Sequence, residues 1–498
     1  MTSPDPYVQD LRDDPHRWAF RLFIVVHLAF WVLVPCLTRS VAHYDSTEAL
    51  AWGLTREWGT NKHPPLSGWL AEAFFRLLGD PDLAVYVLGQ LCVAVALVCI
   101  RRLALGYVSP EAALFSALFL EGVFYYNISA IQYNPNVLSL ALVPAAVYCF
   151  WRAAWTGRAW LWLAAGLVGG LALLAKYTNV FFLLALGVWL AATAQGRSLI
   201  RTYGPWLAAL TAFLVFLPHL AWLAHYDFLP LGYSQAKGDA PLGLAGLNLE
   251  PLRLFLAQVG IASVTLGLWA WLYSKTPRAD RGPRRRPEAF LLCAGLLPLV
   301  FLLAATYIWG VRGSTKWAYA FLGYVPLLLF YCLPIAPPPA LRRAFLLLTY
   351  AVMAAFGTGI AIKNLVFTAE TTNIDGRALA ETLKAAWSET TGRPLRYVGG
   401  HTHLVSRLSA YLPERPRPIW EMDLDRVTVW EDKKTVQEAG VLVLARSESE
   451  YQSFRARWPG LPPPRRLDWT FRAPLAPKLK EADLTVYYGV AQGSALDP

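Results

Sequence analysis

Long apolar stretches alternate with short polar segments along most of the chain. Eleven of these stretches are long enough to cross a lipid bilayer as helices. They lie at about residues 20–38, 82–104, 109–126, 135–152, 159–175, 177–195, 203–223, 254–274, 288–309, 317–335 and 340–362. The pattern predicts a polytopic α-helical membrane protein with about eleven transmembrane helices.

Residues 64–78 form a further apolar segment that is too short to span a membrane and carries Glu72 and Arg76. Such a segment is typical of an amphipathic helix that lies in the membrane interface. We therefore expect an interfacial helix within the first outer loop, which covers residues 39–81.

Composition supports a membrane protein. Hydrophobic residues make up 56% of the chain and charged residues 16%, which is unlike a soluble domain. The net charge of +11 would also suit a nucleic-acid-binding protein, but the basic residues cluster in short loops between apolar stretches. Loops rich in Lys and Arg stay in the cytoplasm and orient membrane proteins. We therefore expect no nucleic-acid partner.

The basic loops fall on one side of the membrane if the predicted helices alternate in direction. They contain Arg101 and Arg102, Arg152 and Arg158, Arg197 and Arg201, Arg342 and Arg343, and the basic residues between 275 and 286. With this side in the cytoplasm, the N-terminus is cytoplasmic. An odd number of crossings then places everything after about Lys363 on the outer side.

Residues 364–498 form a second, polar domain. Apolar strands are predicted at Leu395–Val398, Val441–Ala445 and Thr485–Gly489, and helical segments at Gly376–Thr390, His403–Leu412 and Glu448–Trp458. We expect a small α/β domain on the outer side, attached to a membrane domain of residues 1–363. All six cysteines lie in apolar stretches before residue 363, which indicates packing residues rather than a metal site.

The first outer loop gathers charged residues directly after a membrane-spanning stretch. It carries Asp45, Glu48, Lys62 and His63. One interpretation is structural: Asp45 N-caps a short helix that runs to about Trp58, and Glu48 completes a capping box. The other is chemical: Asp45 or Glu48 is a general base at the membrane surface, and Lys62 binds an anionic group beside it.

Four cations on the outer side oppose the charge bias that orients the chain. They are Lys62, Lys176, Arg312 and Lys316. Each alone can be explained by a long side chain that reaches the membrane surface from a helix end. Together they predict a phosphate-binding site at the outer face, at the depth of lipid head groups.

The second outer loop adds a polar segment that ends in Asn134 and Asn136. Because proline is favoured in the first turn of a helix, Asn134-Pro135-Asn136 can be explained as a turn that opens the next helix. The chain contains none of the motifs GxGxxG, Walker A, HExxH or GxSxG. Nucleotide cofactors and the common hydrolase mechanisms therefore have no support.

Several of these segments resemble, in the same order, those of a known family. Asp45-x-x-Glu48 followed by Lys62-His63-Pro64-Pro65 is similar to the first outer loop of bacterial glycosyltransferases related to protein O-mannosyltransferases and the lipid A aminoarabinose transferase. The segments at 132–136, 169–178 and 310–317 resemble later landmarks of this family, and the resemblance covers roughly residues 20–335. Two departures are His63, where relatives commonly have Lys, and Asn136, where many have an acidic residue.

The resemblance implies a C-type glycosyltransferase fold and an activity. The activity is inverting transfer of a hexosyl or pentosyl group from a polyprenyl-phosphate donor to a lipid, polysaccharide or protein acceptor. The reaction would take place at the outer face of the bacterial inner membrane, with a periplasmic C-terminal domain. Asp45 is the family's candidate base and Glu48 is a neighbouring acid. The donor is expected to contact Lys62, His63, Asn134, Asn136, Lys176, Tyr177, Arg312 and Lys316.

Two other functions compete with this one. A polyprenyl-linked lipid transporter or flippase would need polar groups along a path through the membrane, yet the middles of the predicted helices hold almost no ionisable residue. A non-catalytic lipid-binding membrane protein would share the phosphate site. We expect no cofactor and no metal site, although a divalent cation could use Asp45 and Glu48, which alone form a weak set of ligands.

The predicted topology is tested with reporters fused after Pro498. Because the N-terminus is expected in the cytoplasm and the number of crossings is odd, a reporter fused after Pro498 should lie outside the cytoplasm. Alkaline phosphatase at this position should be active, and green fluorescent protein should be dark. The same reporters inserted after Arg286, in a predicted cytoplasmic loop, should give the opposite pattern. A fluorescent fusion at the C-terminus would contradict the odd number of crossings.

Overall fold

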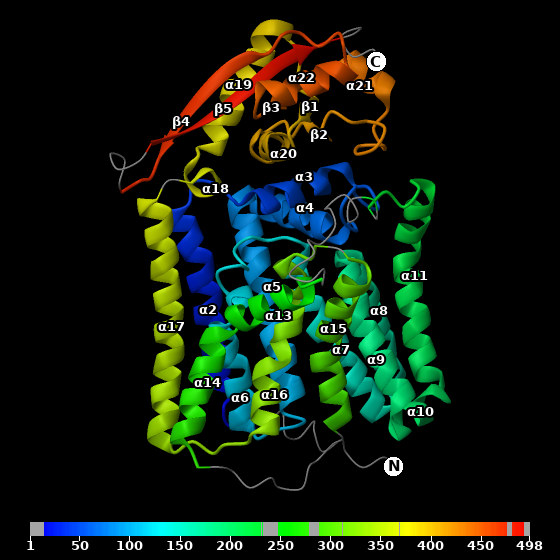
Figure 1. The fold of residues 1–498 in the computed structure, drawn as a ribbon, viewed down its shortest axis with the longest axis vertical. Helices are drawn as coiled ribbons and strands as arrows, with labels where there is room; N and C mark the ends of the chain where they lie inside the picture. The colour runs from blue at the N-terminus through cyan, green and yellow to red at the C-terminus, as the bar shows by residue number, and fades with distance from the viewer. Residues whose placement is uncertain are drawn as a thin grey trace.

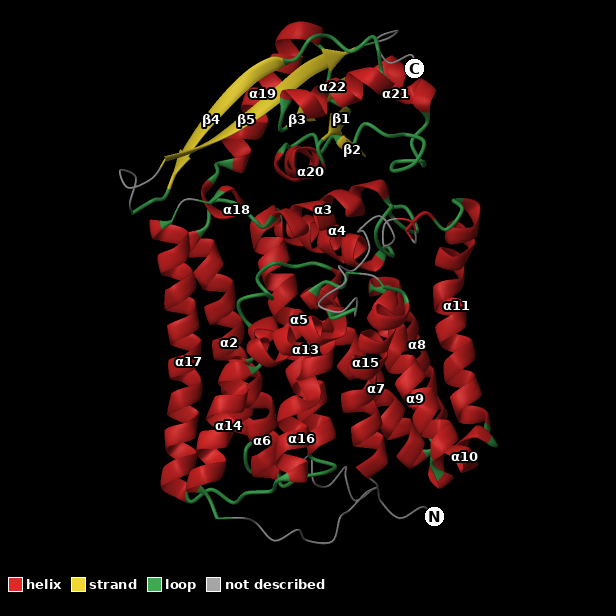
Figure 2. Cartoon of the chain, viewed as in Figure 1, coloured by secondary structure: helices red, strands yellow, loops and turns green. Residues whose placement is uncertain are grey.

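The protein is a helical bundle with a small α/β domain at one end (Figures 1 and 2). The computed structural model describes residues 14–230, 232, 248–277, 288–310, 312–367, 369–475 and 481–492. The longer helices of the bundle are α2 (Arg17–Thr38), α5 (Pro81–Ala104), α7 (Pro135–Thr156), α8 (Ala159–Ala175), α9 (Val180–Ala192), α11 (Tyr203–His225), α15 (Glu288–Ile308) and α17 (Pro339–Val366). Shorter helices complete it: α6 (Pro110–Leu118), α10 (Ala194–Ile200), α13 (Glu250–Ile261), α14 (Ser263–Lys275) and α16 (Val325–Cys332).

Each of the eleven predicted apolar stretches coincides with one helix or with consecutive helices. Among the described residues, six helices are long and apolar enough to cross a membrane, or eight if each of two bent helix pairs is one span. Other stretches are divided into shorter pieces, as at 109–126, where α6 is followed by two 3-10 helices, η1 (Phe119–Gly122) and η2 (Phe124–Tyr126). The fold is thus a polytopic membrane fold, and eleven crossings stay a prediction.

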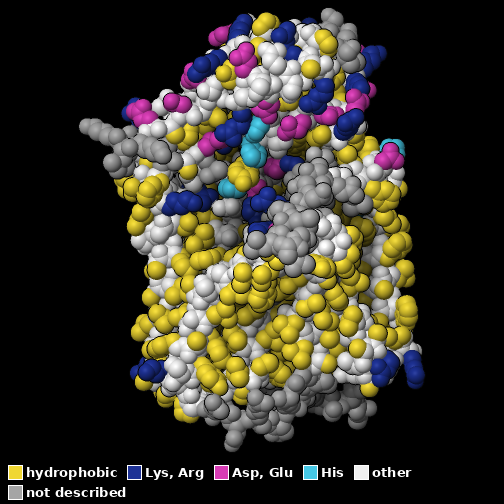
Figure 3. All heavy atoms as spheres, viewed as in Figure 1, with side chains coloured by type: hydrophobic (Ala, Val, Ile, Leu, Met, Phe, Trp, Pro, Cys, Tyr) yellow, Lys and Arg dark blue, Asp and Glu magenta, His cyan; other side chains and the backbone are white. Residues whose placement is uncertain are grey.

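Apolar side chains cover the outside of the bundle, whereas charged side chains gather at its two ends and on the C-terminal domain (Figure 3). Val25 of α2, Leu210 of α11 and Leu347 of α17 are all more than half exposed. Such an extended apolar surface is what contact with lipid tails requires.

Two helices from residues 39–81, α3 (Tyr44–Thr55) and α4 (Leu66–Leu78), lie across the end of the bundle that faces the C-terminal domain (Figure 1). Helix α4 confirms the helix predicted at residues 64–78. The two helices cross so closely that a Cβ atom on Gly53 would lie 2.4 Å from the carbonyl oxygen of Gly68. Glycine at this crossing allows the two backbones to touch, and most of α3 is buried.

The C-terminal domain contains a five-stranded sheet in the order β2-β1-β3-β5-β4. Its strands are β1 (Tyr397–Gly400), β2 (Arg417–Trp420), β3 (Val441–Ala445), β4 (Arg465–Arg472) and β5 (Glu481–Ala491). Strand β1 pairs in parallel with β2 and β3, whereas β5 pairs antiparallel with β3 and β4. The helices of this domain are α18 (Glu370–Asn373), α19 (Gly376–Thr391), α20 (Thr402–Tyr411), α21 (Lys433–Ala439) and α22 (Glu448–Arg457).

The three predicted strands and three predicted helical segments of this domain are confirmed. The sequence pattern missed β2 and β4, which are the two edge strands. Strand β2 has only four residues and contains Pro418, and proline is tolerated at sheet edges because its missing N–H is not needed there. Strand β4 is largely exposed and therefore lacks the apolar run that marks a central strand.

The C-terminal domain is fixed to this end of the bundle by α20 and the residues that follow it. The Tyr411 hydroxyl donates a hydrogen bond to Asp82 Oδ1 at the start of α5, at 2.5 Å. Arg415 forms an ion pair with Glu72 of α4, at 2.9 Å. Buried apolar side chains of α20 and α3 belong to one hydrophobic core. Helix α20 therefore packs on α3 and brings the end of β1 close to the first outer loop.

Candidate active site

A cavity of about 150 Å³ lies beside α3, at the end of the bundle that carries the C-terminal domain. Its wall is formed by α3, the turn that follows it, the start of α7, the end of α8 and the segment around the start of η5 (Thr315–Tyr324). The lining side chains are Asp45, Glu48, Trp52, Lys62, His63, Asn134, Pro135, Asn136, Lys176, Ser314, Lys316 and Trp317. Eight of these residues were predicted as catalytic or donor-binding from the sequence. The fold brings them together from four distant parts of the chain.

The structure corrects the capping that the structural interpretation assigned to α3. His43 is the N-cap, and its Nδ1 accepts a hydrogen bond from the backbone N–H of Asp45 at 3.2 Å. Asp45 therefore lies inside the first turn, where the helix dipole favours a carboxylate, and Glu48 contacts Lys62 instead of closing a capping box. The short helix of the structural interpretation is present, but its capping differs because an imidazole nitrogen takes the acceptor role that Ser, Thr, Asp or Asn usually fill. Burial lowers the pKa of His43 to about 3, so the ring is neutral.

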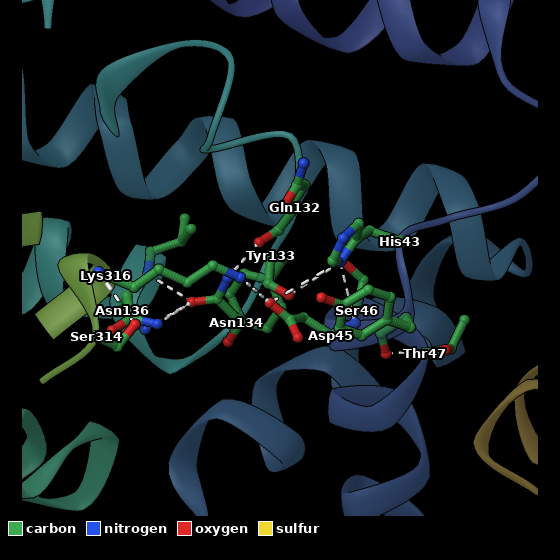
Figure 4. A network of polar contacts seen from close by, with 12 residues as sticks. His43, Asp45, Ser46, Thr47, Gln132, Tyr133, Asn134, Asn136, Ser314 and Lys316 are labelled. Carbon is green, nitrogen blue, oxygen red and sulfur yellow. Dashed lines mark hydrogen bonds and ion pairs between the residues drawn. The ribbon is translucent and has the colours of Figure 1, made fainter. Parts of the chain in front are cut away.

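Asp45 forms an ion pair with Lys316, which lies 271 residues further along the chain. Lys316 Nζ donates to Asp45 Oδ2 at 2.7 Å (Figure 4). Burial alone would lower the pKa of Lys316, but the adjacent Asp45 outweighs it and holds this pKa above its ordinary value. The Asp45 side chain is 22% exposed and lines the cavity, so its carboxylate is within reach of a bound molecule.

Glu48 forms a second ion pair, with Lys62. Lys62 Nζ donates to Glu48 Oε1 at 2.6 Å, and the Glu48 side chain is only 8% exposed. Burial raises the pKa of Glu48 above its ordinary value even though Lys62 acts in the opposite direction. The Thr60 hydroxyl accepts the backbone N–H groups of Lys62 and His63 at 3.1 and 2.9 Å, so a short turn holds both side chains at the cavity.

Asn134 caps α7 and orients its neighbour Asn136, which confirms that this segment opens the next helix. Asn134 Oδ1 accepts both the backbone N–H and the side-chain amide of Asn136, at 2.9 and 2.7 Å. Asn136 Oδ1 in turn accepts a hydrogen bond from Lys176 Nζ. Because Lys176 is 5% exposed, this amide orients a buried ammonium group in the cavity wall (Figure 4 shows the two asparagines).

The segment that carries Ser314 and Lys316 is held in place by α13. Glu250 Oε1 accepts the backbone N–H of Gly313 at 2.9 Å, and Arg253 donates to the carbonyl oxygen of Gly313 at 2.5 Å. Glu250 and Arg253 also pair with each other, with Arg253 Nε 2.8 Å from Glu250 Oε2. One ion pair thus engages both backbone groups of Gly313. This contact fixes the segment that presents Lys316 to Asp45.

Two predicted donor-binding residues lie outside the cavity lining. Arg312 is exposed, and the Tyr177 hydroxyl is hydrogen-bonded to His219 Nε2 at 3.0 Å. The cavity adds four lining residues that the sequence analysis did not predict as site residues: Trp52, Pro135, Ser314 and Trp317. Ser314 had a detectable signal, because Ser before a helix is a preferred N-cap.

Asp45 and Glu48, the two candidate ligands for a divalent cation, are each paired with a lysine. In the part of the chain that the structure describes, no group of three or more His, Cys, Asp or Glu side chains is arranged to hold a metal ion. A divalent cation bound by Asp45 and Glu48 would have to displace the ammonium groups of Lys316 and Lys62 from these carboxylates.

Comparison with known proteins identifies relatives with this architecture. The sequence profile described as dolichyl-phosphate-mannose-protein mannosyltransferase matches residues 62–222. The lipid A galacturonosyltransferase RgtD of Rhizobium johnstonii is 25% identical over 296 residues, which cover 57% of this chain and 59% of the relative. The alignment therefore spans less than two thirds of that protein.

Solved structures show the fold. ArnT from Cupriavidus metallidurans bound to undecaprenyl phosphate superimposes with a TM-score of 0.55 and 13% identity, covering 97% of this chain and all of ArnT. The apo state of the same protein gives a TM-score of 0.54 and 14% identity over 97% of this chain and 99% of ArnT. The chain thus has the architecture of a membrane-embedded C-type glycosyltransferase.

The matched profile, the relative and the fold agree with the order of motifs along the chain. The chain is similar to C-type glycosyltransferases of the protein O-mannosyltransferase and ArnT type. The resemblance stated from the sequence is confirmed.

The two ion pairs of the cavity should differ in their contribution to stability. Glu48→Gln removes the carboxylate from a largely buried pair, which typically costs about 3–5 kcal/mol. Asp45→Asn removes a partner from a pair in which Lys316 is 36% exposed, so solvent screening should limit the loss to about 1 kcal/mol. Thermal unfolding in detergent should therefore show a larger drop in melting temperature for Glu48→Gln. Equal drops would contradict the different burial of the two pairs.

Proposed function

We propose that the protein transfers a sugar, with inversion, from a polyprenyl-phosphate donor to an acceptor hydroxyl at the outer face of the membrane. The observation that carries this proposal is the convergence of two acids and three lysines on one cavity at the outer end of the bundle. A lipid-borne donor suits a cavity at this depth, because the polyprenyl chain can stay in the bilayer while the sugar phosphate enters the site.

Asp45 is the proposed general base. The acceptor oxygen bonds to the anomeric carbon while the bond from that carbon to the phosphate oxygen breaks. The electron pair leaves with the polyprenyl phosphate, and the hydroxyl proton passes to Asp45. Attack from the face opposite the phosphate inverts the configuration. Asp45 fits this role better than Glu48 because its side chain is 22% exposed and that of Glu48 only 8%, and a base must reach the proton that it removes.

The lysines of the cavity are proposed to stabilise the leaving phosphate. Lys316, Lys62 and Lys176 all line the cavity, and fixed cations stabilise charge that develops on a leaving group. An ammonium group has three N–H donors, so Lys316 can contact Asp45 and a phosphate oxygen together. This shared contact would keep the base beside the reacting carbon.

The comparisons support the choice of donor and acceptor to test first. ArnT was crystallised with undecaprenyl phosphate, and RgtD is described as a galacturonosyltransferase that acts on lipid A. We propose a polyprenyl-phosphate-linked hexose or pentose as donor and a lipid-linked glycan as the first acceptor to test. Undecaprenyl-phosphate galacturonic acid with lipid A is the first pair to assay.

Asp45→Asn should reduce turnover by about two orders of magnitude or more, because loss of a general base typically costs this much. Asn cannot accept the proton, yet it is close to Asp in size and should preserve the fold and the binding of undecaprenyl phosphate. Sugar transfer by the purified protein is the measurement. The matched control is Asp425→Asn, at an aspartate whose side chain is 70% exposed in the C-terminal domain. If the turnover of Asp45→Asn were close to that of Asp425→Asn, the role of Asp45 as general base would be contradicted.

Replacing Lys62, Lys176 or Lys316 by Gln should weaken undecaprenyl phosphate binding about 10- to 150-fold, since a hydrogen bond to a charged group is worth about 1.5–3 kcal/mol. Arg312→Gln should change binding by less than about threefold, because Arg312 is exposed and does not line the cavity. Affinity is measured for each variant in detergent. An equal loss at Arg312 would place the phosphate elsewhere, and movement of the lipid across vesicles without sugar transfer would favour a transporter.

A further inference from the structure

Helix α11 carries a buried histidine that joins two segments of the cavity wall. The helix runs beside α8, and its C-terminal end reaches the level of α3 and α4 (Figure 1). Glycine in α8 allows the close approach, because a Cβ atom on Gly170 would lie 2.7 Å from Cβ of Val215. His219 lies one turn beyond Val215 on the same face of α11. It therefore reaches the end of α8, where the chain leaves the helix at Lys176.

Both ring nitrogens of His219 are hydrogen-bonded. Nδ1 lies 2.5 Å from the carbonyl oxygen of Trp58, and Nε2 lies 3.0 Å from the Tyr177 hydroxyl. A carbonyl oxygen can only accept, so Nδ1 donates to Trp58 and Nε2 of the neutral ring accepts the tyrosine O–H. His219 is fully buried. A buried polar side chain is costly unless it is hydrogen-bonded, and these two contacts meet that requirement.

The Trp58 side of this contact holds the turn that carries Lys62. Helix α11 grips the same turn at two further points. Trp222 Nε1 donates to Glu57 Oε2 at 3.2 Å, and a Cβ atom on Gly59 would lie 2.5 Å from the Trp222 ring. One turn of α11 thus fixes three successive residues of the loop, and Lys62 follows shortly after them.

The Tyr177 side holds the segment that carries Lys176. Lys176 ends α8 with an extended backbone, and the 3-10 helix η3 (Tyr177–Asn179) follows it. Lys176 lines the cavity, whereas Tyr177 beside it bonds to His219. At the other end of η3, the side-chain amide of Asn179 donates to Ser139 Oγ of α7 at 2.9 Å. The tyrosine contact is therefore one of two that fix this segment.

We infer that His219 is a positioning residue for the donor phosphate, and that it acts by holding Lys62 and Lys176 at one separation. The inference rests on the proposed transferase function. Both lysines line the cavity, while His219 and Tyr177 do not. Cations stabilise an anion most strongly when they are already held in place, because no reorganisation is then needed. A single imidazole supplies this restraint from behind the cavity wall.

A packing role alone would be met by an apolar ring. The ring centroids of Phe216 and Trp222 lie 5.1 and 5.9 Å from that of His219. Phenylalanine at this position would keep such ring contacts and lose both hydrogen bonds. The positioning role and the packing role therefore predict different results for His219→Phe.

The test measures undecaprenyl phosphate affinity and the melting temperature of the full chain in detergent. His219→Phe should weaken binding about tenfold, because Lys62 and Lys176 lose their common support. His219→Asn places an amide N–H near the position of Nδ1, so it can keep the contact with Trp58. Its affinity should stay within about threefold of wild type.

Tyr177→Phe removes only the hydroxyl that bonds to His219. It should weaken binding about threefold, within the range of a single hydrogen bond. The matched control is Tyr203→Phe, at an exposed tyrosine of α11 whose hydroxyl contacts the carbonyl oxygen of Gly157. This control should leave the affinity unchanged.

A double-mutant cycle separates positioning from a general loss of stability. If His219 acts through Lys62, the combined loss in His219→Phe/Lys62→Gln should be at least about threefold smaller than the product of the two single losses. Tyr203→Phe/Lys62→Gln should match the product. If His219→Phe does not fold, Tyr177→Phe takes its place, in a cycle with Lys176→Gln.

A lower melting temperature with unchanged affinity in His219→Phe would reduce the histidine to a packing role and overturn the inference. Losses that multiply fully in the cycle would overturn it as well, and so would wild-type affinity in Tyr177→Phe. If the coupling is found but no sugar is transferred from any donor, the positioning role stands and the proposed transferase function fails.

Discussion

The ion pair of Asp45 and Lys316 is the contact on which the cavity depends, because it joins the first outer loop to a segment 271 residues away. Charged groups at the edge of a bilayer are stable only when they are paired or hydrated. The helices between these residues must therefore pack in an order that brings both to the same end of the bundle. The Glu48–Lys62 pair and the Lys176–Asn136 contact then line the same cavity. The helix packing that buries the apolar side chains therefore also assembles the polar cavity.

A side-chain N-cap positions one lining side chain at each of three places in the cavity wall. His43, Asn134 and Ser314 are each an N-cap, and each accepts the backbone N–H of the residue two positions later. Those residues are Asp45, Asn136 and Lys316. The beginnings of α3, α7 and η5 therefore meet at the cavity, and the unpaired N–H groups and dipoles of helix N-termini favour an anion there. The electrostatic field of these helix N-termini adds to that of the lysines. Together they favour an anion such as phosphate, although the chain has no dedicated phosphate-binding loop.

The apolar pattern of the sequence predicts most helices of the bundle, because hydrophobic length is a local property that tertiary structure does not override. The order of motifs also predicts eight of the lining residues. It could not separate Lys316 from Arg312, since the two lie four residues apart in a segment whose course is set by Glu250 and Arg253 through Gly313. Nor could it predict His43 as a cap, because histidine is an uncommon N-cap. The stacking of His403 on Tyr44 was equally hidden, because the two rings meet only through the packing of α20 on α3.

Helix α3 has consequences for how such proteins can be recombined. It carries Asp45 and Glu48, crosses α4 at Gly53 and Gly68, and shares its hydrophobic core with α20. The boundary that composition suggests near residue 363 is therefore not the boundary of an exchangeable unit. A chimaera that replaced the C-terminal domain alone would leave the outer face of α3 against a foreign surface. The unit that can be exchanged with its contacts intact is residues 39–81 together with the C-terminal domain, although nearly the whole membrane domain separates the two in sequence.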